Sequence, residues 1–405
     1  MSPTYPPPPD GEAIRSPARS GRRASPRGLA LVLPFAATSL LAGMLVLLLM
    51  ALTACRGPRP DGTAGPGAGP PPSTGAGSAA PAATTTARVH GTPAPSVSGT
   101  SGRSPAQACP PGTVVVADAA ALAAALTRAR PGDSIRLKDG VYAGRFAATA
   151  PGTAAKPVHL CGGPGAVLDG GGTGHGYALH LDGADHWRLT GFTVRNAQKG
   201  VMLDRTSHAV LTGLTVEHIG DEAIHLRADS TDNVVQHSTV RDTGLRRAKF
   251  GEGVYIGTAT GNWCDVTACE PDRSDRNVIR GNRISAVTAE PVDVKEGTTG
   301  GIVEGNTFDG AAMTGSYADS WVDVKGNGWL IKGNTGRHSR GDGFQTHRVS
   351  DGWGDRNVFT ANTADVGGPG WGFHLAPVAG NVVACDNTVT GAAKGLANTA
   401  CRRTW

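Results

Sequence analysis

Two short segments of this 405-residue chain combine aspartate and lysine in the same pattern. Residues 292–295 and 322–325 both read Val-Asp-Val-Lys. In a strand, alternation places both valines on one face and both ionisable side chains on the other. Neighbouring strands lie about 4.8 Å apart, and a nearby ammonium group lowers the pKa of a lysine. Lys295 and Lys325 have this arrangement, in which one lysine can accept a proton and the other can assist it. A solvated ladder of lysine–aspartate ion pairs is the alternative.

Other polar and aromatic side chains fall at equivalent outward positions. His347 occupies the lysine position of a third segment, Gly-Phe-Gln-Thr-His, where an imidazole can donate or relay a proton. Trp263 and Trp353 lie in insertions between strands and can stack on sugar rings, with simple packing as the alternative. The predicted substrate-binding residues are these two tryptophans together with Asp293, Asp323, His225, Tyr255 and Arg227.

An acidic residue precedes three of the outward-facing segments. These residues are Glu222, Glu252 and Glu290. Carboxylate oxygens are the ligands that Ca²⁺ prefers, so the three are candidates for a calcium site. The alternative is that each carboxylate accepts hydrogen bonds from turn amides.

The segments recur with a period that predicts the fold. Asn282, Asn306, Asn334, Asn362 and Asn387 are separated by 24, 28, 28 and 25 residues. A period in the twenties with β-type composition indicates a solenoid, and a leucine-rich signature is absent. We therefore expect an all-β, single-stranded, right-handed parallel β-helix, with the asparagines stacked in a structural ladder.

Residues 114–144 are expected to close one end of this solenoid. They read as a strand, a helix capped near Asp118, and a second strand after Pro131. Leu122 and Leu126 fall on one face of that helix, together with Ala129. An N-terminal helix of this kind covers the open edge of the first coil.

The first 108 residues differ sharply from the rest of the chain. Residues 1–28 are basic and residues 29–54 are uncharged, as in an export signal. Leu-Thr-Ala-Cys at 52–55 resembles the lipobox of bacterial lipoproteins, which predicts lipidation of Cys55. An uncleaved membrane anchor is the alternative. Residues 56–108 are rich in Gly, Pro, Ala and Thr, which predicts a disordered tether before the β-helix domain at 109–405.

Charge and cysteine content narrow the class of protein. Residues 1–108 hold nine basic and three acidic side chains, and the remainder holds 29 and 30. A nearly neutral domain argues against nucleic-acid binding. Six cysteines besides Cys55 suit an oxidising, extracytoplasmic compartment. Proximity favours the pairs Cys109–Cys161, Cys264–Cys269 and Cys385–Cys401, although free thiols and other pairings remain open.

Three segments carry a resemblance to a known family. Residues 131–142, 152–160 and 289–308 (AEPVDVKEGTTGGIVEGNTF) are similar to the parallel β-helix polysaccharide lyases of family six, the alginate lyase and chondroitinase B group of the pectate lyase-like superfamily. The resemblance implies that Lys295 is the base. It also implies a metal site that includes Glu290. Lys325 stands where the family has an arginine.

The residues and the resemblance together predict an extracytoplasmic, membrane-anchored monomer that cleaves an acidic polysaccharide by β-elimination. Two alternatives remain open at this point. One is a cell-surface β-helix that binds glycans without cleaving them. The other is a glycoside hydrolase that uses paired acids such as Asp293 and Asp323.

Overall fold

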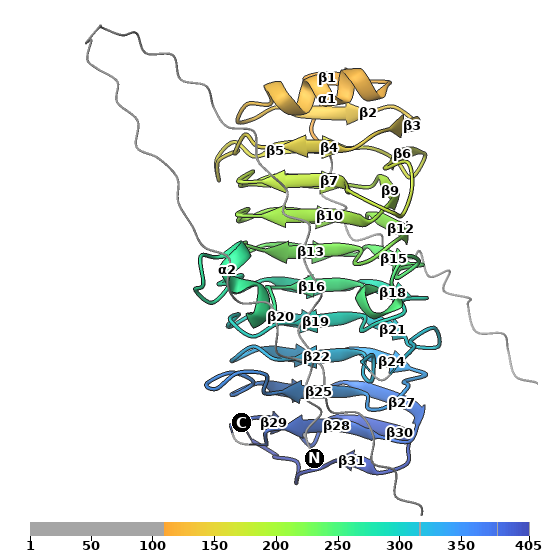
Figure 1. The fold of residues 1–405 in the computed structure, drawn as a ribbon, viewed down its shortest axis with the longest axis vertical. Helices are drawn as coiled ribbons and strands as arrows, with labels where there is room; N and C mark the ends of the chain where they lie inside the picture. Colours follow the sequence, from red (N-terminus) through yellow and green to blue (C-terminus); the bar gives the residue numbers. More distant parts are fainter. Residues whose placement is uncertain (1–108, 316, 379, 405) are drawn as a thin grey trace, which may run out of the picture. The chain divides into compact units, whose positions relative to one another are not determined.

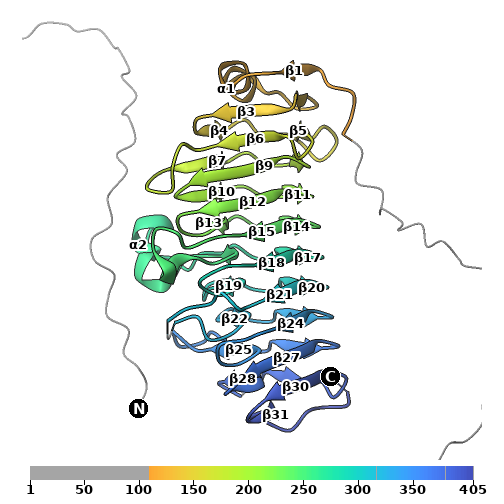
Figure 2. The same cartoon turned by 90° about the vertical axis from the view of Figure 1, so that its right-hand side faces the viewer.

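The computed structural model of the protein describes residues 109–405 except 316, 379 and 405. These residues form a parallel β-helix, a stack of coils in which every strand pairs in parallel with strands of the neighbouring coils (Figures 1 and 2). The predicted fold class is confirmed. The predictions for residues 1–108, including lipidation of Cys55, lie outside the described residues. Within the described part of the chain, no helix is both long enough and apolar enough to cross a membrane.

Each coil contributes strands to three sheets, here called I, II and III in chain order. Sheet I contains β1 (Val114–Val116), β2 (Ser134–Leu137), β5 (Val158–Cys161), β8 (Trp187–Thr190), β11 (Val210–Thr212), β14 (Val234–Gln236), β17 (Val278–Arg280), β20 (Ile302–Glu304), β23 (Leu330–Lys332), β26 (Val358–Thr360) and β29 (Val382–Val383). Sheet II contains β3 (Gly140–Ala143), β6 (Ala166–Asp169), β9 (Thr193–Ala197), β12 (Thr215–Ile219), β15 (Thr239–Arg241), β18 (Arg283–Ser285), β21 (Thr307–Asp309), β24 (Thr335–Arg337), β27 (Thr363–Gly368) and β30 (Thr388–Ala392). Sheet III contains β4 (Phe146–Ala148), β7 (Tyr177–Asp182), β10 (Lys199–Asp204), β13 (Ile224–Arg227), β16 (Val254–Ile256), β19 (Val292–Val294), β22 (Val322–Val324), β25 (Phe344–His347), β28 (Trp371–Ala376) and β31 (Gly395–Ala397).

The side chains that the strands point inward form the core. In β19 and β22, Val292, Val294, Val322 and Val324 are fully buried. β-Branched side chains favour the extended backbone and pack well on a pleated sheet. The predicted alternation is therefore correct, and it leaves the aspartates and lysines of these segments on the outer face of sheet III.

An asparagine ladder connects the coils at the turn between sheets I and II. The Nδ2 group of Asn282 donates to Oδ1 of Asn306, and the same bond links Asn306 to Asn334, Asn334 to Asn362 and Asn362 to Asn387, at 2.9–3.0 Å. These side chains are buried, and each amide also donates to a backbone carbonyl of a neighbouring coil, as Asn282 does to Val235. The ladder fixes the stacking register and hence which side chains meet on sheet III.

The helix α1 (Ala119–Arg128) covers the first coil (Figure 1). Asp118 caps it by accepting a hydrogen bond from the amide of Ala121 at 2.8 Å, and the helix's own side chains Leu122 and Leu126 are buried.

The three predicted disulfides, Cys109–Cys161, Cys264–Cys269 and Cys385–Cys401, are all present. The Cys264–Cys269 disulfide lies in the insertion of residues 258–276, which contains the short helices η2 (Thr260–Asn262) and α2 (Trp263–Val266). A further short helix, η1 (Ala248–Phe250), precedes β16.

Candidate active site

The outward residues of sheet III form two columns along the stack. The pairing of β13, β16, β19, β22 and β25 aligns His225, Tyr255, Asp293, Asp323 and Gln345. Two residues further along each strand, the second column contains Arg227, Gly257, Lys295, Lys325 and His347. The strand ladder continues through the lysines, because their amides donate to Ile256 and Val294 on the preceding coils.

Asp293 and the two lysines form one ion-pair network. The ammonium group of Lys295 lies 2.7 Å from Oδ2 of Asp293, and that of Lys325 lies 2.7 Å from Oδ1 of the same carboxylate. Lys325 also pairs with Asp323 at 2.5 Å. Asp293 and Asp323 are each only 2% exposed, although they point away from the core. The two ammonium groups thus come from neighbouring coils on one face, with a shared carboxylate between them.

This network corrects the predicted charge state of the base. Burial disfavours the charge of Lys295, but the charges of Asp293, Glu296 and Glu252 outweigh burial and raise its pKa above the ordinary value. For Lys325, burial is likewise outweighed by Asp293 and Asp323, and the pKa is raised. The prediction of a lowered pKa for Lys295 is therefore wrong: the charge of Lys295 does lower the pKa of Lys325, but the carboxylates around the two lysines outweigh this repulsion. In this state Lys295 carries its proton as an ammonium group.

The ring of Tyr255 lies between His225 and Lys295. Its centre is 4.4 Å from that of the His225 imidazole and 4.9 Å from the Lys295 ammonium nitrogen. Nε2 of His225 lies 2.9 Å from the carbonyl oxygen of Gly257, which fixes the imidazole. None of the described residues hydrogen-bonds to the Tyr255 hydroxyl. Burial raises the pKa of Tyr255 well above its ordinary value, and Asp293 and Glu252 raise it further.

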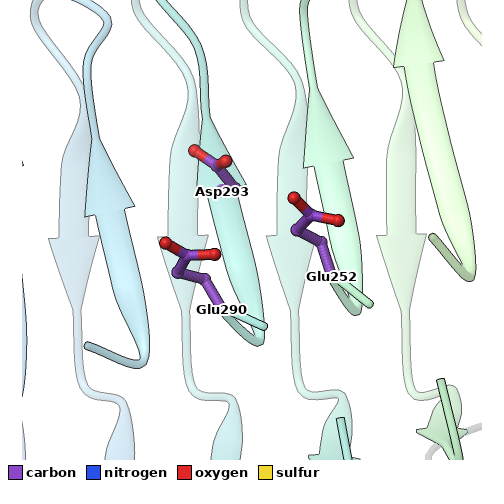
Figure 3. Close-up of side chains that lie close together, drawn as sticks. All are labelled: Glu252, Glu290 and Asp293. Atoms are coloured by element: carbon purple, nitrogen blue, oxygen red, sulfur yellow. The ribbon is translucent and has the colours of Figure 1, made fainter. Parts of the chain in front are cut away.

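Three carboxylates gather next to Tyr255 and Lys295. Glu252 precedes β16, Glu290 precedes β19, and Asp293 lies within β19 (Figure 3). One oxygen from each lies within 4.8 Å of the others, and all three side chains are buried. Oε2 of Glu252 is buried and has no hydrogen-bond partner among the described residues. An all-oxygen donor set with an unpartnered buried carboxylate fits a hard divalent cation such as Ca²⁺.

The electrostatics of the acid cluster point to the same conclusion. Burial, followed by the charge of Asp293, raises the pKa of Glu290 to about 8. Burial and the charges of Glu222, Glu290 and Asp293 raise the pKa of Glu252 well above its ordinary value. The cluster therefore holds more carboxylates than its lysines can balance, and it takes up either protons or a cation.

Glu222, the third predicted metal ligand, is not part of this group of three carboxylates. It precedes β13, the strand next to β16 on its N-terminal side, and its Oε1 pairs with the Lys199 ammonium group at 2.9 Å. Among the described residues, Asp293 completes the group that Glu252 and Glu290 begin. Glu222 is neutralised by a lysine, whereas Glu252 is not.

His347 lies at the other end of the network. Its Nδ1 is 3.0 Å from Oδ2 of Asp323, and its side chain is 38% exposed. The charge of Asp323 is the main cause that raises the pKa of His347 to about 8. Asp323 in turn has its pKa lowered, because His347 and Lys325 outweigh its burial.

The two predicted tryptophans lie in loops beside sheet III. Trp263 begins α2, which lies beside the ends of β13 and β16 (Figure 1). Its indole N–H donates to the carbonyl of Thr258 at 2.8 Å, and its ring lies close to Gly297, two residues after Lys295. Trp353 instead packs against Arg273 of the α2 insertion, at 5.4 Å from the ring centre to the guanidinium carbon. Trp263 is thus close to the lysine network, and Trp353 supports the loop.

Arg227 lies on β13, two strands from Lys295, and pairs with Asp204 of β10. The sequence-based prediction missed Lys199, Asp204 and His180. Lys199 stands two residues before the first inward residue of β10, as Glu222 does before β13, so the repeat alignment extended to earlier coils identifies it.

Comparison with known proteins identifies the family. No protein-family model and no curated protein matches the chain. Among solved structures, an alginate lyase from Paenibacillus sp. str. FPU-7 is 39% identical, with a TM-score of 0.65, over 70% of this chain and 96% of the lyase. The pectate lyase Pel9A is 16% identical, with a TM-score of 0.45, over 68% of this chain and 72% of that enzyme. A mannuronic acid specific polysaccharide family 6 lyase from human gut microbiota is 14% identical, with a TM-score of 0.43, over 68% of this chain and 83% of that enzyme. The identity to the Paenibacillus enzyme, over nearly its whole length, shows that this chain belongs to the β-helix polysaccharide lyases.

Proposed function

We propose that this lyase cleaves a uronate-containing polysaccharide by β-elimination on the outer face of sheet III, with Tyr255 and Lys295 as its proton-transferring residues. The observation that carries the proposal is the contact between the Lys295 ammonium group and the Tyr255 ring, beside the carboxylates of Glu252, Glu290 and Asp293. The family membership and the Paenibacillus alginate lyase support an acidic substrate, and alginate is the first polymer to test.

The elimination has four chemical requirements. The proton on C5 of the uronate must leave with a base, the C4–O4 bond must break as the C4–C5 double bond forms, and O4 must receive a proton. The negative charge that develops on the substrate carboxylate must also be neutralised. A site for this reaction needs a base, an acid and a cation close together.

In this proposal Lys295 is the acid and Tyr255 is the base. Lys295 forms a 2.7 Å ion pair with Asp293, so it approaches O4 as an ammonium group that can give up a proton. The Tyr255 hydroxyl has no hydrogen bond to a described residue, and its ring lies 4.9 Å from that ammonium group. Burial and the nearby carboxylates disfavour the Tyr255 phenolate, so its role as base requires that the adjacent positive charge offset them. This assignment differs from the sequence-based prediction, which had Lys295 as the base.

Glu252, Glu290 and Asp293 are the residues that would hold a divalent cation. When bound, the cation supplies the positive charge that neutralises the substrate carboxylate and acidifies the C5 proton. Because Glu252 and Asp293 are among the groups that raise the pKa of Tyr255, compensation of their charge also favours the phenolate.

Lys325 and His347 have supporting roles. Lys325 contacts both Asp293 and Asp323 and is a positioning residue for them. The partly exposed His347 is oriented by Asp323, and its second ring nitrogen is available to a sugar hydroxyl.

We further propose that the export signal and Cys55 place this monomeric domain outside the cytoplasm on a lipid anchor.

The direct test is to incubate the protein with alginate, pectate and glycosaminoglycans and to follow the ultraviolet absorbance of the unsaturated uronate product. We expect absorbance with at least one uronate polymer, lost on treatment with a chelator and restored by a divalent cation. Reducing ends without absorbance would indicate a hydrolase. Retention of a polymer without either product would indicate a binding protein. For the anchor, Cys55→Ser is expected to release the protein from the membrane fraction.

A further inference from the structure

A second charged cluster lies on the outer face of sheet III, towards its N-terminal end. Asp204 of β10 receives hydrogen bonds from Arg227 of β13, from Nε to Oδ1 at 2.7 Å and from Nη2 to Oδ2 at 3.2 Å. Nε2 of His180 on β7 lies 3.0 Å from Oδ2 of the same carboxylate. The guanidinium group also reaches the Tyr177 hydroxyl at 3.3 Å. The elimination mechanism uses none of these residues.

The cluster holds a guanidinium group ready for a ligand. The carboxylate of Asp204 is nearly buried, with 8% of its side chain exposed, whereas 23% of the Arg227 side chain is exposed. Asp204 accepts hydrogen bonds from Nε and Nη2, the Tyr177 hydroxyl accepts the second one from Nη2, and no described residue accepts a hydrogen bond from Nη1. An arginine held in place by a buried carboxylate loses little entropy when its remaining nitrogen, Nη1, binds an anion.

Arg227 and Lys295 lie in the same outward column. Leu226 aligns with Ile256, and Ile256 aligns with Val294, so the residues that follow these three lie in one column. This part of the second column consists of Arg227, Gly257 and Lys295, and Figure 1 shows β13, β16 and β19 as consecutive strands of sheet III. Two strand spacings separate the two cations, about 10 Å. Gly257, which lies between them, adds no charged side chain to the column.

A uronate polymer presents one carboxylate on every sugar. If the polymer lies along this column with one sugar unit at Tyr255 and Lys295, another of its carboxylates lies near Arg227, because a disaccharide spans about two strand spacings. The Nη1 group of Arg227, which has no described partner, can donate two charge-assisted hydrogen bonds to such a carboxylate.

We propose that Arg227, oriented by Asp204, is a binding subsite for the carboxylate of a uronate unit outside the cleaved linkage. The inference rests on the proposed function and deepens it, since it identifies a position that makes cleavage depend on substrate length. Tyr177 and His180 complete the wall of the subsite on β7.

The test compares Arg227→Gln with the unaltered protein on uronate oligosaccharides of increasing length. For substrates long enough to reach both positions, kcat/KM is expected to fall about 10- to 100-fold, mainly through KM, since a hydrogen bond to a charged group is lost. For the shortest cleaved substrate, the rate is expected to change little. Arg227→Lys, which keeps the charge beside Asp204, is expected to recover part of the loss on long substrates.

Arg195→Gln is the matched control. It breaks a similar arginine–aspartate pair, Arg195 Nε to Asp169 Oδ2 at 2.9 Å, on sheet II. This control is expected to leave the length dependence unchanged. An equal loss for Arg227→Gln at all lengths, or a loss explained by thermal unfolding, would overturn the subsite.

The outcome of this test is separable from that of the proposed function. If the unaltered protein gives no unsaturated product, the elimination proposal fails, and Arg227 is tested by retardation in native gels that contain the uronate polymer. Weaker retardation of Arg227→Gln than of Arg195→Gln supports the subsite, and equal retardation rejects it.

Discussion

The ammonium group of Lys295 lies 4.9 Å from the centre of the Tyr255 ring, on neighbouring strands of sheet III. Side chains of two coils meet at this contact, and the sequence separation of 40 residues between them includes the α2 insertion. A proton donor and a phenol are thus held at adjacent positions along the direction of the stack. This arrangement suits the transfer of two protons at neighbouring atoms of one sugar.

Replacement of Tyr255 by phenylalanine tests the proposed base. We expect kcat to fall about 10²- to 10⁴-fold, the range for loss of a general base, with an unchanged unfolding temperature. The hydroxyl that is removed has no hydrogen bond to a described residue, so little stability depends on it. Tyr142→Phe is the control, because its buried hydroxyl lies 2.9 Å from the carbonyl oxygens of both Val116 and Lys138 and shares its single proton between them. That variant should lose stability and keep its activity.

The lysines are expected to separate activity from stability. Lys295→Met removes one ion pair and should abolish elimination with a modest loss of stability. Lys325→Met removes contacts with Asp293 and Asp323, both buried, and should cost about 3–5 kcal/mol, the range for breaking buried pairs. Urea unfolding measures both variants. Equal destabilisation by the two changes would contradict the shared role of Lys325.

Glu252→Gln tests the cation site by a measurement that does not depend on activity. In the unaltered protein, a divalent cation is expected to raise the unfolding temperature, because binding to the folded state stabilises it. In Glu252→Gln this rise should shrink. The variant without cation should be at least as stable as the unaltered protein, since it lacks a buried carboxylate with an unpartnered oxygen. Glu217→Gln, which alters a carboxylate paired with Arg241 on sheet II, is the control. An unaltered response in Glu252→Gln would exclude this residue as a ligand.

The His347–Asp323 pair predicts a pH dependence of stability. His347 has a pKa of about 8 when folded, above the ordinary value near 6.5, so its contribution is complete below about pH 6.5 and is lost as the pH rises through 8. The charged groups that face it are Asp323, Lys325 and Asp319. The difference in unfolding temperature between the unaltered protein and His347→Asn should therefore narrow from pH 6 to pH 9. A difference that stays constant over this range would refute the link.

The fold was predictable from the sequence because its signals are local. Strand alternation over four residues is enough to place Val292 and Val294 inward and Asp293 outward, and the spacing of the asparagines predicts the stacking of coils. The same reasoning aligned Lys295 with Lys325. It did not extend to β7 and β10, where Lys199 and Asp204 complete the outer face, since these coils lack the Val-Asp-Val-Lys pattern that drew attention to the later ones.

The protonation states were decided only by the tertiary structure. Two lysines on adjacent strands suggest mutual repulsion when they are considered as a pair, and that reasoning predicted a neutral base. In the folded protein, Asp293 lies between them and Glu252 and Glu290 are buried beside them, so the lysines are held as ammonium groups and Glu290 has a raised pKa. Alternation determines which face a side chain occupies. Its charge depends on burial and on all the charges around it, and residues from several coils contribute to both.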